Sequence, residues 1–89
     1  MPIASKKLTV KNKQGLHARP ASLFVQVANR FESNITVIRD DERVNGKSIM
    51  GILMLGAEQG SQITLEADGK DADAALAELE LIVAREDLA

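Results

Sequence analysis

Polar and apolar residues follow the pattern of strands in four short stretches of this chain. Alternation with a period of two is typical of a strand that buries one face, and residues 7–11 and 62–67 show it. Residues 35–38 are all β-branched, which favours a central strand. The polar Asp-Asp pair that follows predicts a turn into a short strand over residues 43–45. We therefore expect four strands, the middle two joined as a hairpin.

The longest apolar series has the spacing of a helix. From Pro20 onward, apolar residues recur every three or four positions, which places them on one side of a helix that should end near Arg30 or Phe31. Proline lacks an N–H group and has a preset φ, so it suits the first turn of a helix. The helix is therefore expected to begin just before Pro20.

Two further helices are predicted. Ser48 is a suitable N-cap and Gly56 a suitable C-terminal stop for a short helix between them. Asp71 or Asp73 should cap the last helix, whose apolar residues lie on one face.

The predicted elements follow the order βαββαβα. Because each strand and helix has an apolar side, an antiparallel four-stranded sheet with helices on one face accommodates all of them. This is a two-layer α+β fold, for which a ferredoxin-like split βαβ topology is the general expectation. The 89 residues are enough for a single domain spanning 1–89 and too few for two.

Composition narrows the classes of function. Cysteine is absent, so neither a disulfide nor a thiolate metal site is expected. Two phenylalanines, without tryptophan or tyrosine, give no stacking platform for nucleic acid. No segment has the pattern of a signal peptide or a membrane-spanning helix, so we expect a cytoplasmic protein with no membrane insertion.

Charge is unevenly distributed along the chain. Residues 1–47 hold nine Lys or Arg and four Asp or Glu, a net +5, whereas residues 48–89 hold two and nine, a net −7. A basic half would suit an anionic group or an acidic partner. The alternative is that the two halves mix in the fold.

The only histidine, His17, lies where a polar turn meets the first helix. A neutral imidazole offers a ring nitrogen as a nucleophile near neutral pH. The unpaired N–H groups of the first helical turn, Ala18 among them, suit phosphoryl oxygens, and the guanidinium of Arg19 has a geometry that matches phosphate. The alternatives are an incidental surface histidine and, less favoured, a metal site, for which no carboxylates lie nearby in the sequence.

The helix that begins at Ser48 is apolar on nearly every side, yet a short helix on one sheet face cannot bury all of its sides. Ile52 and Leu55 are the expected core residues. The other apolar residues form a predicted docking patch for a partner, consisting of Ile49, Met50, Leu53 and Met54. The alternative is a helix wholly within the core.

Two stretches of the chain resemble one known family. The segment 15–21, Gly-Leu-His-Ala-Arg-Pro-Ala, is similar to the active-site signature of HPr, the histidine-containing phosphocarrier of the bacterial phosphoenolpyruvate-dependent sugar phosphotransferase system. The segment 46–52, Gly-Lys-Ser-Ile-Met-Gly-Ile, resembles the regulatory serine region of that family. The resemblance implies an open-faced β-sandwich, in which three helices cover one face of four antiparallel strands.

For function, the resemblance implies a phosphoryl relay. His17 would accept the phosphoryl group on Nδ1 from phospho-enzyme I and donate it to a histidine of a sugar-specific enzyme IIA domain, with Arg19 helping to hold it. Such a protein is a stoichiometric carrier rather than an enzyme and needs no cofactor. Ser48 would be the site of HPr kinase/phosphorylase in carbon catabolite regulation, and the docking patch would contact the enzyme I and enzyme II partners.

Two alternatives for function stay open. The chain could be the nitrogen-related paralogue, which feeds a regulatory enzyme IIA. It could also be a regulatory module whose output is the docking of the Ser48 helix to a transcriptional regulator or a kinase. We expect a monomer in each case.

Overall fold

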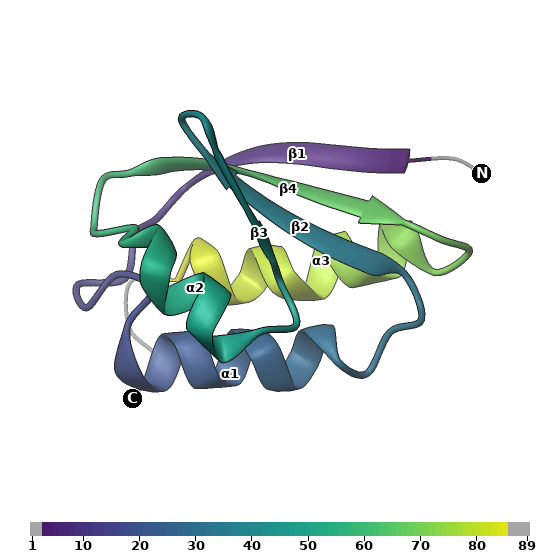
Figure 1. The fold of residues 1–89 in the computed structure, drawn as a ribbon, viewed down its shortest axis with the longest axis horizontal. Helices are drawn as coiled ribbons and strands as arrows, with labels where there is room; N and C mark the ends of the chain where they lie inside the picture. The colour runs from purple at the N-terminus through teal and green to yellow at the C-terminus, as the bar shows by residue number, and fades with distance from the viewer. Residues whose placement is uncertain (1–2, 86–89) are drawn as a thin grey trace.

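The computed structural model describes residues 3–85, and its elements follow the predicted order. Four strands form one antiparallel sheet, and three helices lie against one of its faces (Figure 1). The predicted fold class is therefore confirmed. In chain order the elements are β1 (Ile3–Thr9), α1 (Ala18–Ala28), β2 (Asn34–Arg39), β3 (Glu42–Asn45), α2 (Ile49–Leu55), β4 (Gln62–Asp68) and α3 (Ala72–Val83).

The strands lie across the sheet in the order β1-β4-β2-β3. Both β1 and β2 are antiparallel to β4, so they run parallel to each other with β4 between them. The expected split βαβ unit is present, but a ferredoxin-like sheet would have β3 in that place, so this part of the expectation is wrong. β3 instead pairs with the outer edge of β2 as the predicted hairpin, over only four residues.

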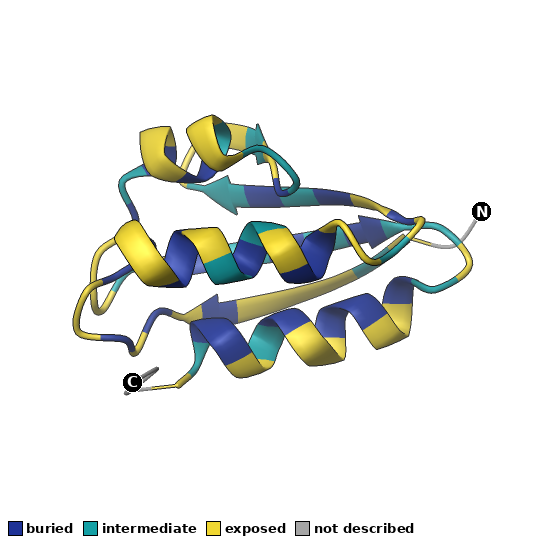
Figure 2. Ribbon diagram, turned by 90° about the horizontal axis from the view of Figure 1, so that it is seen from below, coloured by how far each residue is buried: buried dark blue, intermediate teal, exposed yellow. Residues whose placement is uncertain are grey.

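The core lies between the sheet and the helices. Val37 of β2 and Leu65 of β4, which are neighbours in the sheet, are fully buried. Each helix also contributes a fully buried side chain, Phe24 from α1, Ile52 from α2 and Leu79 from α3. Buried and exposed residues alternate along α1 and α3 (Figure 2), as expected for helices that pack one side against a sheet. No helix within residues 3–85 is long and apolar enough to cross a membrane.

The predicted bounds of two elements, β1 and α1, are wrong. β1 covers Ile3–Thr9 and not residues 7–11. Its start was not evident from the pattern because Lys6, which forms an ion pair of 2.5 Å with Glu80 on α3, interrupts the apolar alternation. α1 ends at Ala28, although its apolar pattern continues to Phe31. Phe31 packs against the core from the turn that follows the helix, so it belongs to the core but not to α1.

Ion pairs show that the two charged halves of the sequence mix in the fold. Each pair recorded among residues 3–85 joins a residue before position 48 to one after it. The pairs are Lys6–Glu80, Arg43–Glu66 and Glu32–Lys70. The alternative interpretation of the charge distribution is therefore the better one.

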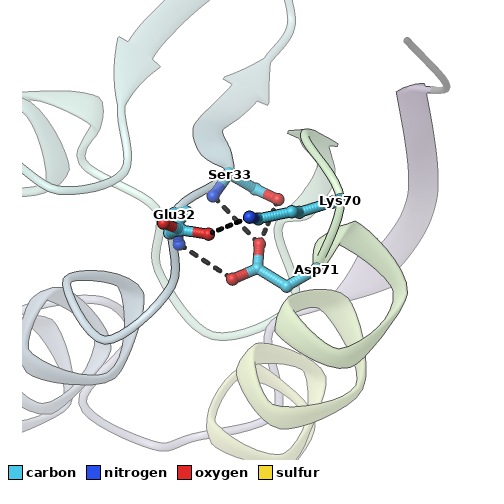
Figure 3. Close-up of polar contacts among 4 residues, drawn as sticks. All are labelled: Glu32, Ser33, Lys70 and Asp71. Carbon is cyan, nitrogen blue, oxygen red and sulfur yellow. Dashed lines mark hydrogen bonds and ion pairs between the residues drawn. The ribbon is translucent and has the colours of Figure 1, made fainter.

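A polar cluster joins the turn after α1 to the turn before α3 (Figure 3). The Asp71 carboxylate accepts hydrogen bonds from the Ser33 hydroxyl and from the backbone N–H groups of Glu32, at 2.8 Å, and Ser33, at 2.9 Å. These bonds, the Ser33 hydroxyl first among them, lower the pKa of Asp71. Asp71 occupies the N-cap position of α3, one of the two predicted, but its side chain makes no cap hydrogen bond because the carboxylate binds Glu32 and Ser33. Asp73 lies in the first turn of the helix.

Candidate functional site

A tight turn leads the chain to His17. The side-chain oxygen of Asn12 accepts a hydrogen bond from the N–H of Gln14 at 2.9 Å, and its carbonyl oxygen accepts one from the N–H of Gly15 at 3.0 Å. Gly15 has a φ of +66°, and a Cβ added there would lie 2.5 Å from the carbonyl oxygen of Ala57. Both the backbone conformation and the available space therefore require glycine.

The residue before His17 is anchored to the segment after α2. Leu16 is buried, and its N–H donates a hydrogen bond of 2.8 Å to the carbonyl oxygen of Ala57. His17 itself is half-buried and occupies the N-cap position of α1 in an extended conformation. Its side chain makes no cap hydrogen bond, so the imidazole is not engaged in closing the helix.

Ala18 departs from the regular helix start that the position of Pro20 predicts. Its φ is +47°, a left-handed value that costs a non-glycine residue about 1–3 kcal/mol. Among residues 3–85, the backbone N–H groups of Ala18 and Arg19 have no hydrogen-bond partner. Two backbone donors beside His17 are therefore not engaged within the described chain.

The Arg19 side chain is exposed, and it forms no ion pair with any residue that the structure describes. The start of α1 thus carries an imidazole, two N–H donors without internal partners and a guanidinium. This set is suited to an anionic phosphoryl group. Within the same described residues, no group of three or more side chains is arranged to hold a metal ion.

α2 has the boundaries and the burial that its sequence predicts. The Ser48 hydroxyl accepts a hydrogen bond from the N–H of Gly51 at 3.1 Å, and Gly56 ends the helix with a left-handed φ. Ile52 and Leu55 are buried. The residues of the docking patch are solvent-exposed, with exposed fractions of 39% for Ile49, 64% for Met50, 38% for Leu53 and 71% for Met54. Binding by this patch stays a prediction.

Bonds at the two ends of α2 show which parts of α1 it lies near. Before α2, the carbonyl oxygen of Lys47 accepts a hydrogen bond from the side chain of Asn29, just beyond the C-terminal end of α1. After α2, Ala57 is bonded to Leu16, just ahead of His17. The C-terminal end of α2, with Leu53 and Met54, therefore lies toward His17. Ser48 lies toward the opposite end of α1.

Sequence reasoning missed Arg39. Its guanidinium donates hydrogen bonds to the carbonyl oxygens of Leu55, at 3.1 Å, and Gly56, at 3.3 Å, at the C-terminal end of α2. Periodicity places this residue at the end of a strand but does not reveal which helix its side chain reaches. Ala57 was missed for the same reason, because its role depends on a contact with a distant part of the chain.

Comparison with known proteins shows the family. The family described as "PTS HPr component phosphorylation site" matches residues 4–85, and this chain therefore belongs to the HPr family of phosphocarriers. The phosphocarrier protein HPr of Treponema pallidum is 49% identical over 75 residues, which are 84% of this chain and 85% of that protein. The HPr-like protein Crh of Bacillus subtilis is 45% identical over 84 residues, which are 94% of this chain and 99% of Crh.

Solved structures of relatives have the same fold. A crystal structure of a phosphocarrier protein HPr from Bacillus anthracis matches with a TM-score of 0.89 and 48% identity, over 91% of this chain and 96% of that one. A crystal structure of an HPr dimer from Thermoanaerobacter tengcongensis matches with a TM-score of 0.71 and 53% identity, over 84% and 87% of the two chains.

Proposed function

We propose that this protein receives a phosphoryl group on Nδ1 of His17 from phospho-enzyme I and passes it to a histidine of a sugar-specific enzyme IIA domain. The observation that carries the proposal is the position of His17 at the start of α1, beside N–H groups that have no partner among residues 3–85. Membership of the HPr family supports the same conclusion.

In the transfer, the lone pair of His17 Nδ1 attacks phosphorus. The bond between phosphorus and the enzyme I donor atom breaks, and its electron pair stays on the donor. The phosphoryl oxygens then accept hydrogen bonds from the N–H groups of Ala18 and Arg19, while the Arg19 guanidinium adds a charge-assisted contact. His17 is regenerated only when the group moves on to enzyme IIA, so the protein acts as a stoichiometric carrier without a cofactor.

The docking patch is the proposed contact surface for enzyme I and enzyme IIA. Leu53 and Met54 lie at the end of α2 nearer His17, where a partner's reacting group has to approach. Ser48 is the proposed site of HPr kinase/phosphorylase. A phosphate there brings a charge of about −1.5 to −2 next to Ile49 and Met50, which disfavours apolar docking and creates a new surface for a transcriptional regulator.

The test is incubation of the purified protein with enzyme I and phosphoenolpyruvate. We expect one acid-labile, base-stable phosphoryl adduct on His17 and none on His17→Ala. Ser5→Ala, which changes an exposed hydroxyl of β1, is the matched control and should be labelled like the wild type. A folded wild-type protein that remains unlabelled contradicts the proposal.

A regulatory docking module is the second candidate, and the similarity to the HPr-like protein Crh favours it. It predicts that His17→Ala leaves the biological output intact and that Ser48→Asp changes it, whereas a carrier loses its output with His17. The nitrogen-related paralogue is a third candidate, which competition between purified enzyme I types distinguishes from the sugar-type carrier.

We also propose that the carrier is monomeric and cytoplasmic. The dimeric structure of the Thermoanaerobacter tengcongensis relative defines the competing oligomeric state. Sedimentation of the purified protein decides between the two states, and fractionation of cells that produce it tests the location.

A further inference from the structure

Arg39 connects the sheet to the end of α2. It is the last residue of β2 and occupies the same face of that strand as the buried Ile35 and Val37, so its side chain lies on the side of the helices. There it donates the hydrogen bonds to Leu55 and Gly56. The last carbonyl groups of a helix have no partner within it and carry partial negative charge, so a guanidinium satisfies and stabilises them.

The segment that Arg39 holds is the one to which the His17 loop is attached. Gly56 is followed directly by Ala57, which is fully buried and whose carbonyl oxygen binds the N–H of Leu16 at 2.8 Å. The same oxygen lies within 2.5 Å of the position that a Cβ of Gly15 would take. Two consecutive residues ahead of His17 thus pack on Ala57, and a shift of Ala57 would displace them.

We propose that Arg39 is a positioning residue for phosphoryl transfer. By fixing the C-terminal end of α2, it sets the place of Ala57, and through Ala57 and Leu16 it sets the place of the His17 imidazole. Arg39 acts through this chain of contacts and without touching the phosphoryl group. The inference rests on the proposed function of His17.

The test compares Arg39→Ala with Arg43→Ala. Arg43 lies on the same hairpin, but its side chain is exposed and pairs with Glu66, so its replacement is a matched control. The first readout is hydrogen exchange of the Leu16 amide relative to the Leu65 amide in the central strand. We expect Arg39→Ala to speed the exchange of the Leu16 amide about tenfold beyond any change at Leu65. This is the effect on local opening expected when a hydrogen bond from a charged donor is lost.

The second readout is the kinetics of His17 phosphorylation by enzyme I. Misplacement of the imidazole lowers kcat roughly tenfold in Arg39→Ala. The KM changes less, because only Leu53 and Met54 of the docking patch lie at the end of α2 that Arg39 fixes, whereas Ile49 and Met50 lie at its other end. Arg39→Lys should restore part of the rate, since an ammonium group also donates hydrogen bonds to carbonyl oxygens. Arg43→Ala should match the wild type in both readouts.

A folded Arg39→Ala protein with wild-type Leu16 exchange and wild-type kcat overturns the inference. If Arg39→Ala does not fold, Arg39→Lys and Arg39→Gln provide the same two measurements, and wild-type values in both variants overturn it equally. If the wild type itself is not phosphorylated, the proposed function fails. The exchange of the Leu16 amide still decides whether Arg39 positions the loop.

Discussion

The starts of α1 and α2 differ in whether a side chain of the helix's own N-cap residue binds the N–H groups of the first turn. Each helix leaves backbone N–H groups without partners in its first turn. Ser48 supplies its own hydroxyl oxygen to the N–H of Gly51, so the start of α2 is capped from within. At α1, His17 takes the corresponding position without a cap bond, and Ala18 has a left-handed φ. Within residues 3–85 the N–H groups of Ala18 and Arg19 have no partner, so the start of α1 can offer them to a ligand, as the proposed function requires.

The strongest change to the start of α1 is expected from Gly15→Ala. The new Cβ would meet the Ala57 carbonyl oxygen at a backbone φ that disfavours alanine, and we expect a loss of about 3 kcal/mol in the free energy of unfolding. Gly60→Ala is the matched control, because Gly60 also has a positive φ but no atom within 4 Å of the added Cβ. It should lose about 1 kcal/mol in urea denaturation. Equal losses would contradict the importance of the Ala57 contact.

Met54→Ala tests whether α2 provides partner docking while α1 provides the phosphoryl-transfer site. Met54 is 71% exposed at the end of α2 nearer His17, and its loss should raise the KM for phosphorylation by enzyme I about tenfold with little change in kcat. Leu81→Ala removes a comparably exposed apolar side chain, 63% exposed, from α3 and should leave both constants unchanged. A similar rise in KM for the two variants would show that the docking patch has no special role.

The comparison of the two helix starts is measured directly by Ser48→Ala and His17→Ala. Removing the Ser48 hydroxyl deprives the Gly51 N–H of its partner, and the free energy of unfolding should fall by about 1 kcal/mol. His17→Ala removes no cap bond and should stay within about 0.5 kcal/mol of the wild type. The reverse order in urea denaturation would mean that His17 stabilises α1.

The start of α3 can be compared with the other two helix starts by the effect of pH on stability. The pKa of Asp71 is lowered in the folded protein, so the unfolded chain binds more protons as the pH falls below about 4. The stability that Asp71 contributes is therefore fully present above the ordinary pKa of 3.8 and is lost as the pH falls through the lowered folded value. The stability difference between wild type and Asp71→Asn should shrink over that range. A constant difference down to pH 2 would contradict this linkage.

Strands and helices were predictable where one face is buried and the spacing of apolar and polar residues shows it locally. The β-branched residues 35–38 and the Ser48 and Gly56 signals mark their elements within a few positions. The pattern predicts too late a start for β1 because Lys6, on the same face of the strand as Leu8, is charged and pairs with Glu80, a partner 74 residues away. The order of strands was not predictable, since periodicity shows that a strand has a buried face but not which strand lies beside it.

In the candidate site, too, the residues with a local sequence signal were predictable and those that depend on distant contacts were not. His17, Arg19 and Ser48 occur in short segments, and the docking patch follows from a helix with too many apolar residues to bury. The left-handed φ of Ala18 has no signal in the sequence, because alanine is the residue that most favours a regular helix. Arg39 and Ala57 depend on contacts between distant segments, which only the folded chain displays.

Among the strands of residues 3–85, β4 is the last to be synthesised, and it is also the strand that joins β1 to β2. During translation, β1 has no native strand partner until residues 62–68 have left the ribosome. The native sheet therefore cannot assemble progressively from the N-terminus, and its central pairings are long-range contacts of the kind that slow folding. We expect a ribosome-bound chain that stops before β4 to lack the native sheet, although the β2–β3 hairpin is already present in it.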